Sequence, residues 1–498
     1  MYGKRKEVFL LVIITVIGTC LRMYRLGYQS LWLDEILTFL SSNGTLSHVL
    51  FQTEIQTNIL PLYYLVVHAF LALSDQEVFL RVPSLIFGSL TIPLFYYTVR
   101  HTFGTQMGLW ASSLLAISPF HIFYSQEARP YAMFLLLCLL AFYLLQLCIE
   151  KKESRLLKLS FAIVGASTFY CHTAAIPFLA FLGLYIVIVL PMDQWRNWIP
   201  TFLGLGILLL PALYRAFIIQ VYGKIWQTFD PFSLPNILWV FTTGFSFGSS
   251  LLDLHVAEKM KYVIPHFLYI VPIFILILGL VLYGARKTFQ DNKANILVFA
   301  LFFFLPISFM SLAAIVTFRP FHVRHVVPSL LPFIVFIALG IHSLQKRVLQ
   351  NLCVGIFIVI SGFSLNNYYF DNRYHREDNR GAANFLTMHS IENDLVICRT
   401  PYTTTNLFYY LPPPRLVKII PFRTKAKVVT SQQLPEEMKQ AITGRDRFWV
   451  FYSGAFEGKP KGPLEQHFDE NYPSRLEFYS SGIKLILYEV VKDNPRRM

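Results

Sequence analysis

The N-terminal stretch VFLLVIITVIGTCLRM, residues Val8–Met23, decides the class of this protein. It is an apolar run that follows the basic residues Lys4–Lys6. A secretory signal peptide would have a shorter apolar run and a cleavage site made of small residues. The segment Leu21–Arg25 reads LRMYR and is no such site. We therefore expect an uncleaved membrane helix whose N-terminus lies in the cytoplasm.

The composition of the whole chain agrees with this interpretation. Of the 498 residues, 55% are hydrophobic and 14% are charged, and the mean hydropathy is +0.49. Soluble domains carry about 25% charged residues. The sequence therefore predicts a polytopic α-helical membrane protein, with about 11–13 transmembrane helices within residues 1–366.

The net charge of +14 has a simple explanation in a membrane protein. From residue 367 onward the chain holds 19 Lys/Arg and 15 Asp/Glu, so +10 of the charge belongs to the membrane part. Basic residues at the ends of membrane helices are typical of the positive-inside rule, and we expect no nucleic-acid partner. Five of the six cysteines lie in apolar segments, which excludes a disulfide framework.

Basic clusters also predict the orientation. Lys151–Arg155, Arg286–Lys287 and Lys346–Arg347 are expected in the cytoplasm. Alternation then places the loops at about 27–60 and 220–262, and everything after residue 367, on the exoplasmic face of the plasma (inner) membrane.

The number of apolar runs before residue 126 conflicts with this orientation. Three apolar runs separate the loop at 27–60 from residue 126, although both are expected on one face. Either the short run 61–73 is re-entrant, or the run 79–100, which contains two prolines, is broken in two.

The tail, residues 367–498, changes in character. Four short apolar segments are typical of strands, namely Asp394–Cys398, Val417–Ile420, Arg447–Phe451 and Ile483–Tyr488. Asn379–His389 and Gln433–Ile442 are typical of helices. We expect a small soluble α/β domain. No nucleotide-binding motif is present.

Asp34 and Glu35 form a carboxylate pair just beyond the first apolar run. A carboxylate at the membrane is costly to desolvate, so such a pair indicates a function. The alternative is a helix cap or a charge that stays in water. Two neighbouring residues of a helix point about 100° apart. Glu35 is therefore expected to orient Asp34, to contact an acceptor, or to be solvated.

Several ordered segments carry a resemblance to a known group. They are Ser30–Glu35, Pro61–Tyr64, Leu80–Ser84, Ser118–Tyr131, Tyr170–Thr173, Arg324–Pro328 and Arg380–Leu386. Together they resemble the polytopic glycosyltransferases of the GT-C superfamily, which use polyprenyl-phosphate sugars. This group includes bacterial glycosyltransferase family 39, the protein O-mannosyltransferases and the lipid A aminoarabinose transferases.

The resemblance implies a GT-C fold and makes Asp34 the general base that takes the proton of an acceptor hydroxyl. The chain departs from the group at one point. Asn58 stands where the aminoarabinose transferases have an acid, and Glu54 is the nearest substitute. Glu54, Asn58, Tyr63 and Tyr131 are predicted to line the acceptor site or cavity.

Cationic groups are needed to hold the departing phosphate, because guanidinium binds phosphate in a bidentate fork. Glu127 and Arg129 stand at an expected span end, and Pro130 disfavours helix at Arg129. Interfacial anchoring is the alternative for this segment. His172 is a second candidate, although a histidine at a span end is often structural.

The segment Phe318–His325 gathers four basic groups on the expected exoplasmic face, namely Arg319, His322, Arg324 and His325. They suit a phosphate or pyrophosphate, and lipid headgroups are the alternative ligand. His172, His322 and His325 could also hold a metal, but no diagnostic ligand spacing identifies one. No cofactor is predicted with certainty, and a divalent cation could be held by Asp34 and Glu127.

Two functions remain open at this point. The first is a glycosyltransferase (hexosyl or pentosyl transferase) that moves a sugar, mannose-like or other, from a polyprenyl phosphate to a protein, glycan or lipid hydroxyl, with inversion. The second is a transporter or flippase of a lipid-linked saccharide. Transporters often show internal repeats, and none is evident here.

Overall fold

The computed structural model describes residues 2–51, 60–151, 154–220, 230–231, 233–248, 267–317, 321–398, 401–411, 413, 417–421, 436–454 and 461–490. The chain divides into two compact units. We call residues 1–26 and 38–367 the membrane unit, and residues 27–37 and 368–498 the C-terminal unit. The segment 27–37, which carries Asp34, thus groups with the tail rather than with its neighbours in sequence.

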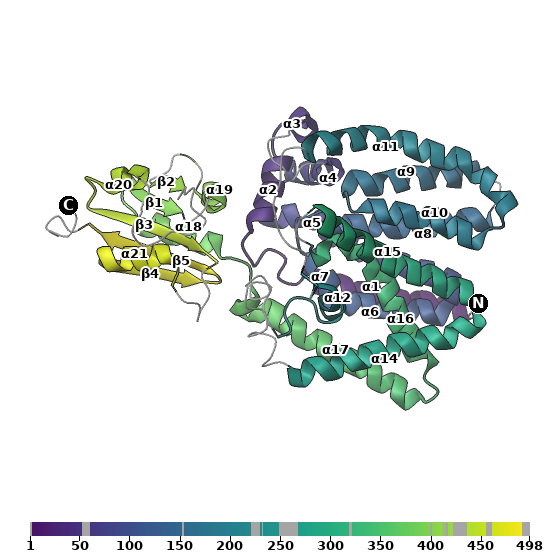
Figure 1. Cartoon of the computed structure of the whole chain (residues 1–498). Helices are drawn as coiled ribbons and strands as arrows, with labels where there is room; N and C mark the ends of the chain where they lie inside the picture. The colour runs from purple at the N-terminus through teal and green to yellow at the C-terminus, as the bar shows by residue number, and fades with distance from the viewer. Residues whose placement is uncertain are drawn as a thin grey trace. The chain divides into compact units, whose positions relative to one another are not determined.

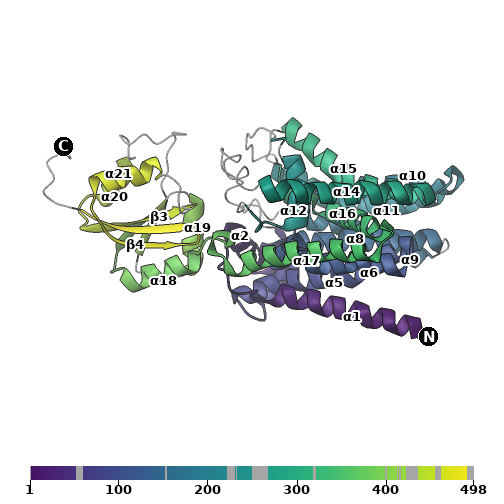
Figure 2. The same ribbon diagram turned by 90° about the horizontal axis from the view of Figure 1, so that it is seen from below.

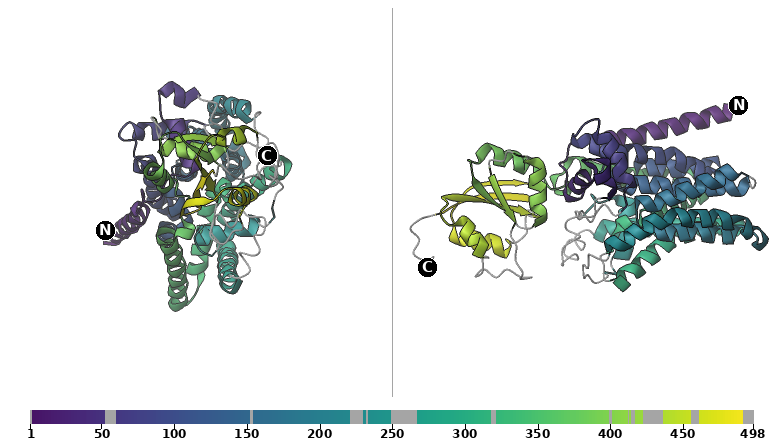
Figure 3. Two further views of the ribbon diagram at one scale, coloured as in Figure 1. Left: turned by 90° about the vertical axis from the view of Figure 1, so that its left-hand side faces the viewer. Right: turned by 90° about the horizontal axis from the view of Figure 1, so that it is seen from above.

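The described part of the membrane unit is helical, and its long helices lie side by side (Figures 1 and 3). The first part of the chain forms α1 (Tyr2–Met23), α2 (Leu33–Ser42, which begins in the C-terminal unit), α3 (Leu46–Phe51), α4 (Leu62–Leu71), α5 (Glu77–Phe103), α6 (Thr105–Ile117), α7 (Pro119–Ser125), α8 (Tyr131–Glu150), α9 (Arg155–Cys171) and α10 (Ala175–Val189). The second part forms η1 (Met192–Trp198), α11 (Ile199–Gln220), α12 (Ser233–Thr243), α14 (Phe267–Asp291), α15 (Lys293–Thr317), η4 (Val323–Ser329), α16 (Leu330–Ser343) and α17 (Arg347–Phe370).

The lengths of these helices divide them into two groups. Among the described residues, seven helices are long and apolar enough to cross a membrane, or eight if the bent pair α6–α7 is one span. The helices α4 and α10 are apolar but shorter, with 10 and 15 residues. The polytopic helical class predicted from the sequence is confirmed.

The lengths of α4 and α5 bear on the two explanations for the odd number of apolar runs. Helix α5 is continuous from Glu77 to Phe103 and contains both prolines in its interior. Helix α4 rises about 15 Å over its length, half of the ~30 Å hydrocarbon core. That the run 61–73 does not span the membrane stays a prediction, and the short length of α4 favours it.

The C-terminal unit is built on a five-stranded mixed sheet of order β2-β1-β3-β5-β4. Its elements are η5 (Asn372–Tyr374), α18 (Asn379–His389), β1 (Asp394–Cys398), α19 (Pro401–Tyr410), β2 (Val417–Pro421), α20 (Glu436–Ile442), β3 (Arg447–Ser453), α21 (Pro463–Asn471), β4 (Ser474–Ser480) and β5 (Ile483–Glu489). The strands β1, β2 and β3 are parallel, whereas β5 is antiparallel to β3 and β4.

Alternation along β3 divides the core of this unit between two faces. Phe448 and Val450 pack with residues of α20 and α21. Trp449 and Phe451 pack with residues of α18 and α19 on the other face. Figure 2 shows α18 and α21 on opposite sides of the sheet. The sheet is therefore buried on both faces, as in other α/β domains.

Besides the short 3-10 helix η5, three elements of this unit have no counterpart among the predicted ones: α19, α21 and β4. Helix α19 reads PYTTTNLFYY, and β-branched and aromatic residues have low helix propensity. Strand β4 is an edge strand with mostly exposed side chains, so its alternation is dominated by polar residues. The four predicted strands all form.

Candidate functional site

The segment between α7 and α8 carries two of the predicted site residues in a tight turn. Glu127 and Arg129 are only 1% and 9% exposed. The Arg129 N–H donates to the Glu127 carbonyl at 2.7 Å. Arg129 lies outside both helices, as expected from the proline that follows it, and α8 begins at Tyr131. The sequence thus places an acid and a guanidinium in one buried turn.

A chain of hydrogen bonds fixes the backbone of this turn. Ser84 Oγ donates to the Arg129 carbonyl at 3.2 Å, and the Tyr63 hydroxyl lies 2.8 Å from Ser84 Oγ. A Cβ on Gly88 would lie 2.0 Å from Ser125 Oγ, so α5 approaches α7 at a distance only glycine permits. Tyr63, predicted to line a cavity, is fully buried and supports the turn through Ser84.

His172 brings a second segment to the same place. It lies in the turn between α9 and α10, where its ring is 5.6 Å from the Tyr131 ring and 6.3 Å from the His325 ring. Removal from water, together with the positive charges of Arg129 and Arg324, lowers the pKa of His172 to about 3. His172 is therefore neutral at physiological pH.

The tautomer of His172 follows from its hydrogen bond. Its Nδ1 accepts from the Ala174 N–H at 3.0 Å. In a neutral imidazole the other nitrogen then carries the proton, so Nε2–H is a donor.

The segment with η4 supplies the remaining predicted groups, namely His322, Arg324 and His325. The rings of His322 and His325 lie 5.6 Å apart, and Arg324 stands between them in sequence. We call Arg129, His172, His322, Arg324 and His325 the basic cluster. It unites three segments that are far apart in the sequence. Of the other predicted residues, Glu54, Asn58 and Arg319 lie outside the described part of the chain.

Sequence reasoning missed Arg22, which is fully buried near the end of α1. Its guanidinium donates to the Leu115 and Ala116 carbonyls at 3.1 and 2.9 Å, and to His121 Nδ1. These carbonyls belong to the last turn of α6, where intrahelical donors run out. Arg22 therefore braces the 62° bend between α6 and α7. The position of Arg22 inside an apolar run could have identified it as a residue with a structural or functional role.

Gln126 and Arg81 fasten the chain that follows α1. Gln126 Nε2 donates to the Arg22 and Tyr24 carbonyls, both at 2.8 Å. Arg81, 1% exposed, donates to the Leu26 carbonyl at 2.9 Å. These contacts fix the turn that carries Glu127 and Arg129 to the end of α1.

The predicted carboxylate pair lies in the first turn of α2, within the C-terminal unit. Asp34 is half-buried. Glu35 is fully buried, and its Oε2 accepts from Arg376 Nη1 at 2.7 Å. Glu35 is therefore not simply solvated. Arg376 lies 341 residues further along the chain, and nothing in the sequence around it predicts that it pairs with Glu35.

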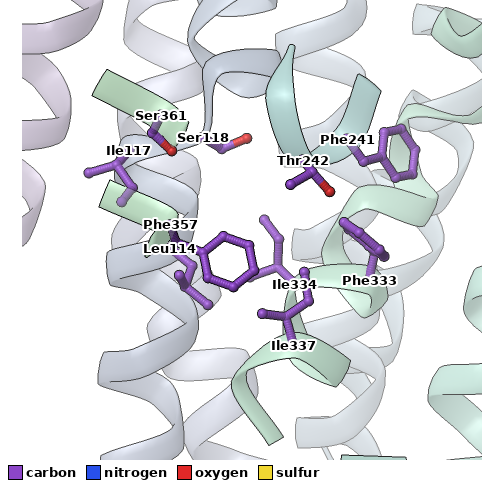
Figure 4. A pocket seen from close by; sticks show the side chains of 10 residues that line it. All are labelled: Leu114, Ile117, Ser118, Phe241, Thr242, Phe333, Ile334, Ile337, Phe357 and Ser361. Atoms are coloured by element: carbon purple, nitrogen blue, oxygen red, sulfur yellow. The ribbon is translucent and has the colours of Figure 1, made fainter. Parts of the chain in front are cut away.

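Among the described residues, no group of three or more His, Cys, Asp or Glu side chains is arranged to hold a metal ion. A pocket lies between α6, α12, α16 and α17 (Figure 4). It is lined by Leu114, Ile117, Ser118, Phe241, Thr242, Phe333, Ile334, Ile337, Phe357 and Ser361. These walls suit hydrocarbon, and none of them belongs to the predicted site.

Comparisons with known proteins agree with this architecture. Residues 60–215 match the family described as dolichyl-phosphate-mannose-protein mannosyltransferase. No curated protein sequence matches the chain.

Two groups of solved structures are similar. ArnT from Cupriavidus metallidurans in the apo state has a TM-score of 0.61 at 9% identity, covering 98% of both chains. ArnT bound to undecaprenyl phosphate has a TM-score of 0.56 at 9% identity, covering 96% of this chain and 97% of that one. The apo oligosaccharyltransferase from Archaeoglobus fulgidus has a TM-score of 0.54 at 10% identity, covering 100% of this chain and 76% of its own. The resemblance predicted from the motifs is confirmed: the chain has the GT-C fold of membrane glycosyltransferases.

Proposed function

We propose that this protein transfers a sugar from a polyprenyl phosphate to an acceptor hydroxyl at the exoplasmic face of the membrane. The observation that carries the proposal is the family match over residues 60–215, because that segment contains the Glu127–Arg129 turn and His172. The match of the fold over nearly the whole chain length supports it.

The basic cluster is suited to hold the phosphate of the donor. As the bond to the sugar breaks, the departing polyprenyl phosphate takes the electron pair and its negative charge grows. Guanidinium groups and the Nε2–H of neutral His172 are donors for phosphate oxygens. Arg129 is held on a backbone that is fixed by Ser84, so little reorganisation is needed as charge develops.

Asp34 is the proposed general base. The acceptor hydroxyl gives its proton to the Asp34 carboxylate, and its oxygen attacks the anomeric carbon from the side opposite the phosphate. A new carbon–oxygen bond forms, the bond to phosphate breaks, and the anomeric centre inverts. Asp34 is only half-buried in the first turn of α2, so part of the residue is accessible.

The test uses the purified full-length protein with a panel of polyprenyl-phosphate sugars that carry a radiolabel in the sugar. Transfer of label to an acceptor, or to water, supports the enzyme and identifies the donor. A transporter would move intact donor across proteoliposomes without releasing sugar, and that result would overturn the proposal.

A further inference from the structure

The sheet of the C-terminal unit has a topological switch point between β1 and β3. The chain leaves β1 toward β2 on one side and then returns to β3 on the other. Open α/β sheets bind ligands in the crevice at the carboxyl ends of such strands. Here Glu377 lies at that end of β3, where its Oε1 accepts from Ser453 Oγ at 2.6 Å and from the Gly454 N–H at 3.2 Å.

The segment 27–31 attaches next to Glu377 in the manner of a bound peptide. Ser30 Oγ donates to the Glu377 carbonyl at 2.8 Å. The Leu31 N–H donates to the Tyr410 hydroxyl at 2.7 Å, and the Leu31 carbonyl accepts from Asn379 Nδ2 at 3.1 Å. Both backbone polar groups of Leu31, a buried residue, are thus satisfied by side chains that lie at least 340 positions away.

The contact nearest to the proposed base is the buried ion pair between Glu35 and Arg376. The two side chains are 0% and 8% exposed. The Arg376 N–H also donates to Gln29 Oε1 at 3.0 Å, so Arg376 binds the segment at two places. A charge removed from water this completely is stable only with its partner in place. The first turn of α2, which carries Asp34, is therefore tied to the residues that precede α18.

We infer that the C-terminal unit is a positioning domain for the segment that carries Asp34, and that Arg376 is a positioning residue that acts through Glu35. This inference rests on the proposed function, since it gives Asp34 the role of base. The segment 27–37 of the same chain is then the partner that Arg376, Glu377 and Asn379 hold.

The experiment compares full-length wild type with Arg376→Gln, in which the ion pair is broken. The first measurement is hydrogen–deuterium exchange of peptides that cover residues 27–37. We expect faster exchange in Arg376→Gln and no change in Arg373→Gln. Arg373 is the matched control, because it is three positions away and pairs with Asp371 at 77% exposure.

The second measurement is the kinetics of sugar transfer. Misplacement of a catalytic group by ~1 Å lowers a rate by about 100-fold. We expect kcat to fall by roughly that factor in Arg376→Gln while KM for the donor stays within about twofold, and Arg376→Lys to recover part of the loss. A role in stability alone would not separate kcat from KM or be rescued by lysine.

A second variant covers the case in which Arg376→Gln does not fold. Tyr410→Phe keeps the ring and removes only the hydrogen bond to Leu31, so exchange of 27–37 should rise and kcat should fall by a smaller factor.

Unchanged exchange or unchanged kcat in the folded variants would overturn the inference. If wild type transfers no sugar from any donor, the proposed function fails. The exchange measurement then still decides whether Arg376 holds the segment.

Discussion

At Arg129 the main chain and the side chain have separate partners. The backbone is held by Ser84 and by the turn from Glu127, and the guanidinium donates to Thr38 Oγ1 at 3.5 Å. Its charge also acts on His172. A guanidinium whose backbone is fixed in this way suits an anionic ligand.

Replacement of Arg129 should therefore impair phosphate binding in the transition state. We expect Arg129→Gln to lower kcat/KM by about 100-fold and Arg129→Lys to have an intermediate effect, because ammonium lacks the planar fork. The matched control is Arg100→Lys, which replaces a partly exposed arginine paired with Glu7. The measurement is the initial rate of sugar transfer. A wild-type rate in Arg129→Gln would show that Arg129 does not bind the phosphate.

Glu377 gives a prediction for pH dependence. Burial raises the pKa of its carboxyl above the usual value of 4.5, although Ser453 and Gly454 donate to it. Between 4.5 and the raised pKa, the folded state keeps a proton that the unfolded state releases. Stability is therefore lost as the pH rises through this window.

Glu377→Gln should remove this loss of stability at higher pH, because an amide oxygen can accept the same two hydrogen bonds without carrying a charge. We expect slower hydrogen exchange of β3 in the variant at pH 7.5 and equal exchange at pH 4. Glu470→Gln, on the exposed side of α21, is the control. A variant that exchanges faster than wild type at pH 7.5 would show that the carboxylate is stabilising.

Among the helices, α14 and α16 make a close crossing through two glycines. A Cβ on Gly284 would lie 2.3 Å from the Gly340 backbone nitrogen. Small residues allow such close approach of helix backbones within membranes. A Cβ on Gly279, which also lies on α14, would meet no heavy atom of the described residues within 4 Å.

Substitution at the crossing should therefore separate the two helices. We expect Gly284→Leu to lower the thermal stability of the detergent-solubilised protein, with an effect of about 1–3 kcal/mol from overpacking. Gly279→Leu should have little effect. The measurement is the size-exclusion profile of each solubilised variant after heating. An equal loss of folded protein in both variants would contradict a close crossing at Gly284.

Local patterns were enough to predict the helices of the membrane unit and most of the sheet. Apolar runs marked each long helix, and four of the five strands were predicted at or near their observed bounds. Helix α19 was missed because packing of Leu407 in the core outweighs weak local propensity.

The candidate site could be predicted only in part. The segments with Arg129, His172 and Arg324 were each identifiable as basic residues at helix ends. Their association, and the partnership of Glu35 with Arg376, depend on contacts between distant parts of the chain, for which a single sequence has no local signal.

For the whole molecule, the proposed topology can be checked directly. The C-terminal unit is expected on the exoplasmic face and Lys151 in the cytoplasm. Both Lys151 and Glu470 are exposed. In intact cells, a membrane-impermeant maleimide should label Glu470→Cys and not Lys151→Cys, with labelling of wild type as the background. The reverse labelling pattern would show that the topology is opposite to the proposed one.

The role proposed for Asp34 is that of the base in a sugar transfer. The most direct measurement compares transfer from the preferred polyprenyl-phosphate sugar by wild type, by Asp34→Asn and by the control Asp75→Asn, which changes an exposed residue of the loop before α5. We expect a loss of about 100-fold or more in Asp34→Asn, because general-base catalysis contributes at least that factor, and no loss in the control. Equal turnover by Asp34→Asn and wild type would contradict it.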